Sequence, residues 1–228
     1  FADGGYAHPP GYPLYAVLLR LFAWLPASSP AHGASLVTAA LGAASVAVLY
    51  GAGRVWGAGR AAACFGAIAF GVSTHVWLFH TQPEVFALNH LVAATILFLA
   101  APAAPVSGRT RALLLGLAAG LGLANHHTIV FIAPVGFYGV YLAVRESSAV
   151  VRTLIAGAAA IAVGLAPYAW LVYVSQTDAG WHWGDGSTIG GVVHHFLRMD
   201  YGTFQMTAGE TPDRPLEQIV FFATETFR

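Results

Sequence analysis

The stretch ALLLGLAAGLGLANHHTIVFIAPVGFYGVYLAV, residues 112–144, decides the fold. A membrane-spanning helix needs about 17–25 mainly apolar residues, and this run as one helix would be about 50 Å long against a hydrocarbon core of about 30 Å. Asn125, His126 and His127 interrupt the run. A continuous helix would bury these three polar side chains in lipid, at a cost of several kcal/mol. We therefore expect two helices, 110–124 and 128–144, that meet at a polar break.

The composition is that of an integral membrane protein. Of the 228 residues, 57% are hydrophobic and 9% are charged, and the mean hydropathy is +0.65. A soluble domain carries about 25% charged residues. We therefore expect an all-α, polytopic transmembrane helix bundle whose main partner is the lipid bilayer. The formal net charge is zero, so no nucleic-acid partner is expected.

Further spans are expected at 34–53, 61–80, 85–101 and 153–174, within one membrane domain over residues 1–228. Arginine positions indicate how these spans alternate, because cytoplasmic loops carry an excess of basic residues. The arginines concerned occur as three loop pairs: Arg54 and Arg60, Arg109 and Arg111, and Arg145 and Arg152. All three pairs fall on one face only if residues 112–144 are split and residues 12–25 form an interfacial or re-entrant helix. Residues 175–228 then form an extracytoplasmic segment.

The first candidate site is HPPGYP, residues 8–13. Proline fixes φ and removes backbone donors, so this stretch is stiff. It is either a helix-entry turn with a surface histidine or a rigid loop that presents His8 over a site. Arg20 follows within the apolar helix, where it either snorkels to the interface or pairs with a lipid phosphate.

Glu84 is the candidate catalytic residue. It follows Pro83 at the start of a span, where a carboxylate is favoured by the helix N-terminus, and an acid at the membrane edge is also a site candidate. A His/carboxylate metal site could be drawn from His80, Glu84 and His90. Pro83 breaks the helical register between the first two, so no metal site is predicted.

Two more segments carry candidate binding residues. Asn125, His126 and His127 form either a satisfied polar kink or the lining of a substrate pocket, because buried polar side chains need partners. In WHWGDG, residues 181–186, the aromatic ring of Trp183 suits stacking on a sugar and Asp185 can accept sugar hydroxyls. The alternative for this segment is an interfacial tryptophan anchor followed by a turn.

Four blocks of this sequence, taken together, resemble the DUF2723 family. They are HPPGYPLY (8–15), TQPEVFALNHL (81–91), GLGLANHHTIVFIAP (120–134) and WHWGDGSTIGGVVHHFLRMDYG (181–202). That family is similar to the protein O-mannosyltransferases of the GT-C glycosyltransferase superfamily. Its members carry an acidic loop upstream of the HPPGYP block that would supply a general base. This sequence has no such loop, so we expect an N-terminally truncated chain.

The resemblance implies a GT-C-type membrane glycosyltransferase. Such an enzyme transfers a sugar, expected to be mannose, from a polyprenyl-phosphate donor to a hydroxyl of a protein or glycan. The site is expected on the extracytoplasmic side of a bacterial inner (cytoplasmic) membrane, with no cofactor. Glu84 would be the acidic site residue, His8 and Arg20 would contact the lipid phosphate, and the other candidates would contact donor or acceptor.

The alternative is a non-enzymatic transporter or flippase-like helix bundle. Such a protein would need polar groups on both faces and at the midplane. The inner loops of the expected topology carry arginines and little else, which argues against this class. A metal-dependent membrane hydrolase is a third candidate.

Overall fold

A computed structural model describes residues 5–177 and 181–201 of the chain, and its elements are helices. The expected all-α membrane bundle is confirmed. One isolated bridge, between Tyr6 and His182, is the β pairing among the described residues. The helices are α1 (Pro13–Leu21), α2 (Pro30–Val55), α3 (Arg60–Val72), α4 (Thr74–Thr81), α5 (Phe86–Ala100), α6 (Gly108–Asn125), η1 (His127–Ile132), α7 (Ala133–Arg145), α8 (Val150–Gly164), η2 (Ala166–Tyr168), α9 (Ala169–Val174), α10 (Ile189–Phe196) and η3 (Met199–Tyr201).

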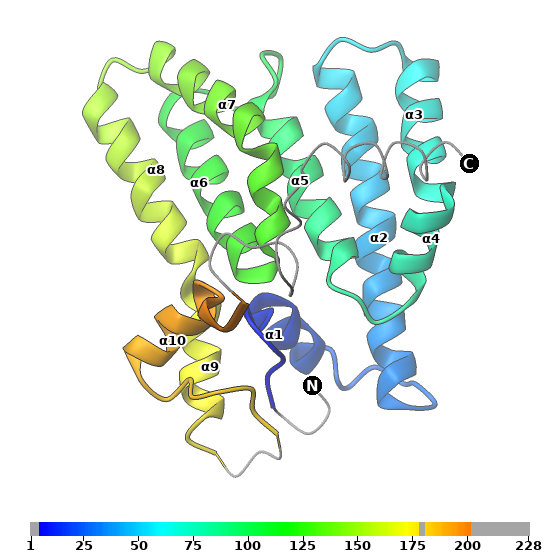
Figure 1. The fold of residues 1–228 in the computed structure, drawn as a ribbon. Helices are drawn as coiled ribbons and strands as arrows, with labels where there is room; N and C mark the ends of the chain where they lie inside the picture. Colours follow the sequence, from blue (N-terminus) through cyan, green and yellow to red (C-terminus); the bar gives the residue numbers. More distant parts are fainter. Residues whose placement is uncertain (1–4, 178–180, 202–228) are drawn as a thin grey trace, which may run out of the picture.

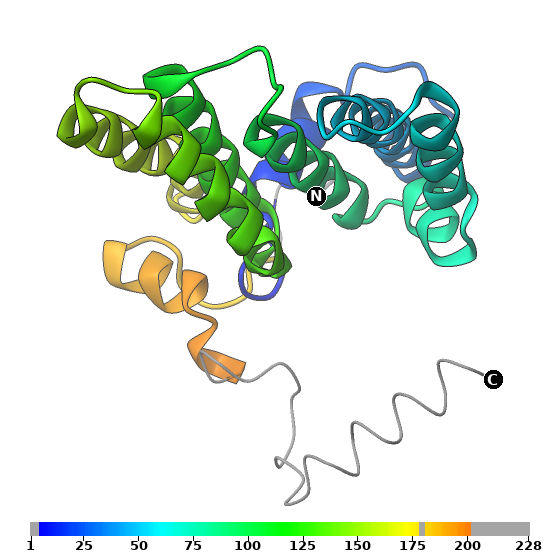
Figure 2. The same cartoon turned by 90° about the horizontal axis from the view of Figure 1, so that it is seen from above.

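The longer helices stand side by side in a row, and α1, α9 and α10 lie below them, at the lower ends of the helices (Figure 1). In the described part of the chain, three helices are long and apolar enough to cross a membrane: Pro30–Val55, His127–Arg145 and Val150–Val174. A fourth span is possible if α3 and α4 count as one, although they bend by 65°. The view from above shows the row and places α10 to one side of it (Figure 2).

Glycine allows α6 and α8 to pack closely. A Cβ at Gly116 would lie 2.2 Å from the carbonyl oxygen of Gly157, and a Cβ at Gly120 would lie 2.2 Å from that of Ile161. These separations are far below van der Waals contact, so the two backbones touch only because no side chain stands between them. Small residues at helix interfaces are the usual basis of such packing in membranes.

Arg111 joins three helices at the end of the bundle that carries the arginine loops. Its guanidinium donates to the carbonyls of Leu99 (2.6 Å) and Ala101 (2.7 Å) and forms an ion pair with Glu146 (3.2 Å). Arg111 is only 1% exposed. It therefore satisfies the last carbonyls of α5, which have no partners within that helix, and differs from the exposed Arg109 beside it.

The two ends of the bundle have different chemistry. The α2–α3, α5–α6 and α7–α8 loops, with the arginine pairs, lie at the upper end in Figure 1 and are called the arginine end. The opposite end holds α1, the α4–α5 loop and the break between α6 and η1. At that break Asn125 is fully buried and donates from Nδ2 to the carbonyl of Val85 (3.1 Å). The hydrogen bond from Asn125, at the expected interruption of the apolar run, therefore joins the end of α6 to the start of α5.

Candidate functional site

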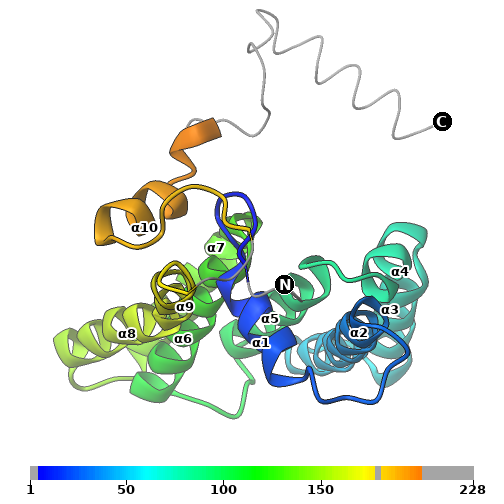
Figure 3. The ribbon, with the colours of Figure 1, turned by 90° about the horizontal axis from the view of Figure 1, so that it is seen from below.

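Aromatic and imidazole rings gather at the end opposite the arginine end. The ring of His8 lies 5.4, 6.1 and 6.2 Å from those of Tyr12, Trp183 and Tyr201, and Tyr12 stacks in parallel on His126 at 5.6 Å. We call these five residues the His8 cluster. Seen from this end, the N-terminal segment and α10 approach each other over α1 and α9 (Figure 3). Residues from three distant parts of the sequence therefore meet here.

Tyr6 holds the Trp183 segment against the N-terminal segment. Its hydroxyl accepts from the backbone N–H of Gly186 (2.7 Å) and from Ser175 Oγ (3.1 Å), and it donates to the carbonyl of Gly184 (3.2 Å). Its ring also stacks on His182. Tyr6 is only 2% exposed, so these bonds are sheltered and fix the position of Trp183.

Gly11 brings His195 against the HPPGYP turn. Its φ is +84°, and a Cβ there would lie 2.7 Å from Nε2 of His195. The turn is closed by a hydrogen bond from Gly11 N–H to the carbonyl of His8 (2.8 Å), and Tyr168 donates to the carbonyl of Pro10 (3.3 Å). HPPGYP is therefore a helix-entry turn packed against α10 and η2, and it leaves the side chain of His8 exposed.

His126 has a fixed tautomer. Its Nδ1 accepts the backbone N–H of Thr128 (3.2 Å) and lies 2.8 Å from the Thr128 hydroxyl. The proton of the neutral ring is therefore on Nε2, which can donate a hydrogen bond. Burial, followed by the positive charges of His127, Arg198 and His8, lowers the pKa of His126 to about 4. The ring is neutral near pH 7 and can donate without carrying a charge.

Several buried polar atoms near the break lack a hydrogen-bond partner among the described residues. They are Asn89 Oδ1, Asn125 Oδ1, His127 Nε2, His195 Nε2 and Arg198 Nε. The ring of His127 packs on Phe196 of α10 at 5.1 Å. Buried polar groups are normally paired, so a concentration of unpaired ones is typical of a site that takes a polar ligand.

Backbone strain is also concentrated here. Among the described residues, the two non-glycine residues with positive φ are Tyr12 (φ 48°) and Arg198 (φ 54°). Such conformations are uncommon for side-chain-bearing residues and gather at functional sites. Tyr12, Arg198 and His195 are not among the site residues predicted from the sequence. Arg198 lies in the block 181–202, three residues after the pair His194 and His195. A positive charge so close to two histidines was the sequence signal that could have identified Arg198 as a site residue.

Glu84 lies beside the cluster. It belongs to the loop between α4 and α5 and is half-buried. Its negative charge raises the pKa of Tyr12, after the larger effect of burial, and the charge of Arg198 acts in the opposite direction. The charges of Glu84 and Arg198 thus both affect the pKa of the Tyr12 hydroxyl, and the ring of Tyr12 stacks on His126.

Two predicted site residues lie away from the cluster surface. Asp185 is exposed and accepts the backbone N–H of Ser187 (2.9 Å). Hydrogen bonding from the side chain of Ser187, followed by that from its backbone, lowers the pKa of the Asp185 carboxyl group. Arg20 is in the last turn of α1, about 12 Å along the helix from Tyr12. It lines a separate hollow of about 690 Å³ that also contains Ser28 and Pro83.

His80 and His90 pair with each other. Nε2 of His80 lies 2.9 Å from Nδ1 of His90, and His80 is pressed against Gly42 of α2. The two rings connect α4 to α5 and α2. Within residues 5–177 and 181–201, no group of three or more His, Cys, Asp or Glu side chains is placed to hold a metal ion.

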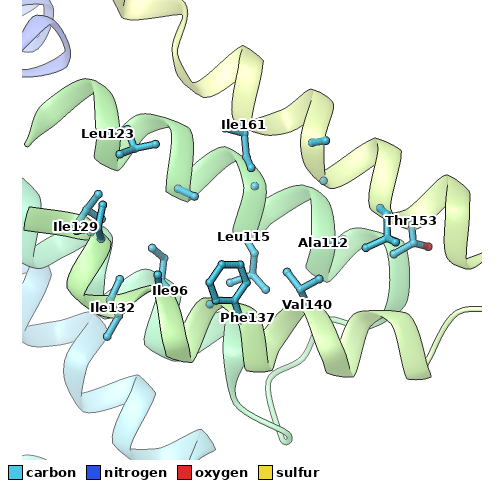
Figure 4. A pocket seen from close by; sticks show the side chains of 18 residues that line it. Ile96, Ala112, Leu115, Leu123, Ile129, Ile132, Phe137, Val140, Thr153 and Ile161 are labelled. Atoms are coloured by element: carbon cyan, nitrogen blue, oxygen red, sulfur yellow. The ribbon is translucent and has the colours of Figure 1, made fainter. Parts of the chain in front are cut away.

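An apolar groove of about 380 Å³ runs between α6, α7 and α8. Figure 4 shows Leu115, Leu123, Phe137 and Ile161 around it, with Ile129 at one end and Thr153 at the other. Ile129 belongs to η1, the element that begins with His127. The groove therefore leads from the polar break along the apolar part of the bundle.

These features define a membrane-spanning helical protein with a histidine- and aromatic-rich site at one end. The chain matches the sequence profile of the family described as "Protein O-mannosyl-transferase TMEM260 N-terminal domain" over residues 3–150. The chain belongs to this family.

Two relatives extend this similarity to most of the chain. "Protein O-mannosyl-transferase TMEM260" of Mus musculus is 33% identical over 97% of this chain and 33% of its own length. "Protein O-mannosyl-transferase tmem260" of Dictyostelium discoideum is 28% identical over 90% of this chain and 27% of its own length. The chain thus spans about a third or less of these relatives. No solved structure matches it.

Proposed function

We propose that the chain is the donor-binding part of a GT-C-type glycosyltransferase, similar to the DUF2723 family. It transfers mannose from a polyprenyl-phosphate donor to a hydroxyl of a protein or glycan. The observation that carries this proposal is the His8 cluster, where aromatic rings suited to a sugar lie beside buried polar atoms that have no hydrogen-bond partner among the described residues. The names of the mouse and Dictyostelium relatives support the reaction class.

The groove between α6, α7 and α8 supports a lipid-linked donor. A nucleotide-linked sugar would have no use for an apolar channel, whereas a polyprenyl chain needs one. The groove starts at η1, directly after His127. A lipid chain lying in it would place its phosphate at the polar break, next to His126 and His127.

In the proposed reaction, the acceptor hydroxyl oxygen attacks the anomeric carbon as Glu84 removes its proton. The bond between that carbon and the phosphate oxygen breaks, and its electron pair stays on the polyprenyl phosphate. General-base catalysis of this kind contributes about 10²–10⁴-fold. Donors fixed in advance, here His8, His126 and His127, stabilise the developing negative charge.

The other predicted residues have supporting roles in this proposal. Trp183 stacks on the sugar or acceptor, and Asp185 binds hydroxyls at the rim. Asn125, at the break between α6 and η1, ties the end of α6 to the start of α5. Arg20, from its separate hollow, meets a phosphate group at the bilayer interface.

The proposed orientation places the His8 cluster on the extracytoplasmic side of a cytoplasmic membrane. The arginine loops, which lie at the opposite end (Figure 1), are then cytoplasmic, in accord with the positive-inside rule. The concentration of unpaired polar atoms at one end also argues against a transport path through the bundle.

A transfer assay with the full-length protein tests the donor class. Labelled mannose would be offered to an acceptor protein either on polyprenyl phosphate or on a nucleotide. Transfer from the lipid donor alone is the expected result. Transfer from the nucleotide donor alone, or none from either, would contradict the proposal.

A further inference from the structure

Arg198 is held in an unusual backbone position next to the break. It follows α10 with a left-handed φ of 54°, and its N–H donates to the carbonyl of His195 (3.1 Å). Its own carbonyl accepts from Tyr201 N–H (2.9 Å), and its guanidinium lies over the Tyr201 ring, 5.6 Å from the ring centre. Left-handed backbone is costly for a residue with a side chain, so the fold holds this cation in place against that cost.

The charge of Arg198 has no carboxylate partner in the described part of the chain. The ion pairs there join Arg111 to Glu146 and His194 to Asp200. Nε of Arg198 is buried and has no hydrogen-bond partner among the residues that the structure describes. A buried donor without a partner is destabilising, and an anionic ligand would remove that cost.

The neighbours of Arg198 are donors of the kind an anion needs. Nε2 of His126 carries the free proton of a neutral ring, because Nδ1 is already used as an acceptor. Nε2 of His127 is buried and unpaired, and its ring packs on Phe196, two residues before Arg198. Glu84 is a carboxylate whose charge also acts on Tyr12, in the opposite direction to that of Arg198. One fixed positive charge and two imidazoles therefore lie close enough for their charges to interact.

We propose that Arg198, with His126 and His127, forms the site that binds the phosphate group of the donor lipid. This inference rests on the proposed function and extends it to a residue that the candidate-site prediction did not contain. Guanidinium groups are well suited to phosphate because they present several N–H donors in a planar fork. The phosphate would sit where the apolar groove meets the break, and the sugar would lie toward Trp183.

Anion binding at this site also changes the proton balance. The positive charge of Arg198 is one cause of the low pKa of His126. A bound phosphate offsets that charge and raises the pKa of the ring, so binding favours proton uptake.

A binding experiment with the full-length protein in nanodiscs tests the assignment. Three probes are compared by native mass spectrometry or competition: polyprenyl phosphate, polyprenol of the same length, and inorganic phosphate. The variants are Arg198→Gln, Arg198→Lys as a second variant that keeps the charge, and Arg60→Gln as a matched control at the arginine end. Unfolding midpoints establish that each variant is folded.

The wild type and Arg60→Gln are expected to prefer polyprenyl phosphate over polyprenol. Arg198→Gln should lower the affinity for polyprenyl phosphate by roughly ten- to a hundredfold, the range for a lost charged hydrogen bond. The affinity of Arg198→Lys for this lipid should lie between those of the wild type and Arg198→Gln. The affinity for polyprenol should be the same in all variants. Competition by inorganic phosphate that depends on Arg198 would indicate a site for phosphate as such. If inorganic phosphate does not compete but binding of polyprenyl phosphate still depends on Arg198, the site requires the lipid chain as well as the phosphate.

Two outcomes would overturn the inference, and they differ in what they say about the reaction. If the wild type transfers mannose from the lipid donor and Arg198→Gln keeps full preference for polyprenyl phosphate, Arg198 is not the phosphate ligand and the proposed function stands. If the wild type neither prefers the lipid phosphate nor transfers mannose, both proposals are wrong.

Discussion

At the scale of single residues, the structure places four predicted site residues at the same end of the bundle and Arg20 in a separate hollow. His8, His126, His127 and Trp183 were selected for their type and setting, and the structure brings them to one end of the bundle. The sequence could not predict that Arg20 lies apart from these residues, because its position depends on the direction in which α1 runs. Arg198 was missed because its position depends on α10 folding back over η1, a long-range contact that leaves no local periodicity.

Gly11 offers a direct test of the turn that presents His8. Gly11→Ala introduces a Cβ at φ +84° and 2.7 Å from His195 Nε2, and should lower the free energy of unfolding by about 1–2 kcal/mol. Thermal unfolding in detergent measures the change. Gly66→Ala is the control, because a Cβ there meets nothing within 4 Å and alanine favours the helix. Equal midpoints for the two variants would show that the turn is not constrained as described.

The low pKa of His126 leads to a prediction about how the stability of the protein depends on pH. Its pKa is about 4 in the folded protein and about 6.5 when unfolded, so the unfolded chain binds the proton first as the pH falls. The contribution of this residue to stability is therefore complete above pH 6.5 and is lost progressively between about pH 6.5 and 4. Unfolding midpoints at several pH values should fall less steeply for His126→Gln than for the wild type. Identical slopes would mean that His126 is not buried as a neutral ring.

At the scale of elements, the apolar runs and their interruptions predicted helix positions, but bends and caps depended on tertiary contacts. The break at Asn125 was visible as three polar residues in an apolar run. The 65° bend between α3 and α4 at Ser73 was not, because Ser73 is a single small residue. Arg111 was read as a loop arginine, whereas the fold buries it against the end of α5.

Arg111 is expected to be essential for the arginine end. Arg111→Met removes the partner of Glu146 and of two α5 carbonyls. Breaking a fully buried ion pair costs about 3–5 kcal/mol, and the cost here should be smaller because the Glu146 side chain is 32% exposed. We expect a large drop in the unfolding midpoint of the full-length protein in detergent. Arg109→Met, an exposed neighbour, should leave the midpoint near that of the wild type. A small effect at position 111 would mean that Glu146 and the α5 carbonyls find other partners.

The α6–α8 contact is predicted to tolerate no side chain. Gly120→Ala would put a Cβ 2.2 Å from the carbonyl oxygen of Ile161, so the helices must separate. We expect destabilisation of about 1–3 kcal/mol, the range for overpacking. Gly136→Ala on α7 is the control, since its Cβ would meet only Ile96 at 3.8 Å. The two variants behaving alike in thermal unfolding would argue against close packing of α6 and α8.

At the scale of the whole molecule, the separation of the two ends is the organising feature. Structural ionic contacts hold the arginine end, and rings, unpaired donors and Glu84 occupy the other. The apolar groove reaches the second end from within the bundle. This arrangement suits a substrate whose tail lies in the membrane and whose head reacts at its surface.

The rate of mannosyl transfer by full-length Glu84→Gln tests the central claim, that the His8 cluster with Glu84 is the reacting site. The amide keeps the size of the side chain but cannot accept the acceptor proton. We predict a fall in transfer from polyprenyl-phosphate mannose of at least about a hundredfold, with an unchanged unfolding midpoint and unchanged binding of polyprenyl phosphate. A transfer rate equal to that of the wild type would contradict the account, because the chemistry would then take place without the carboxylate beside the cluster.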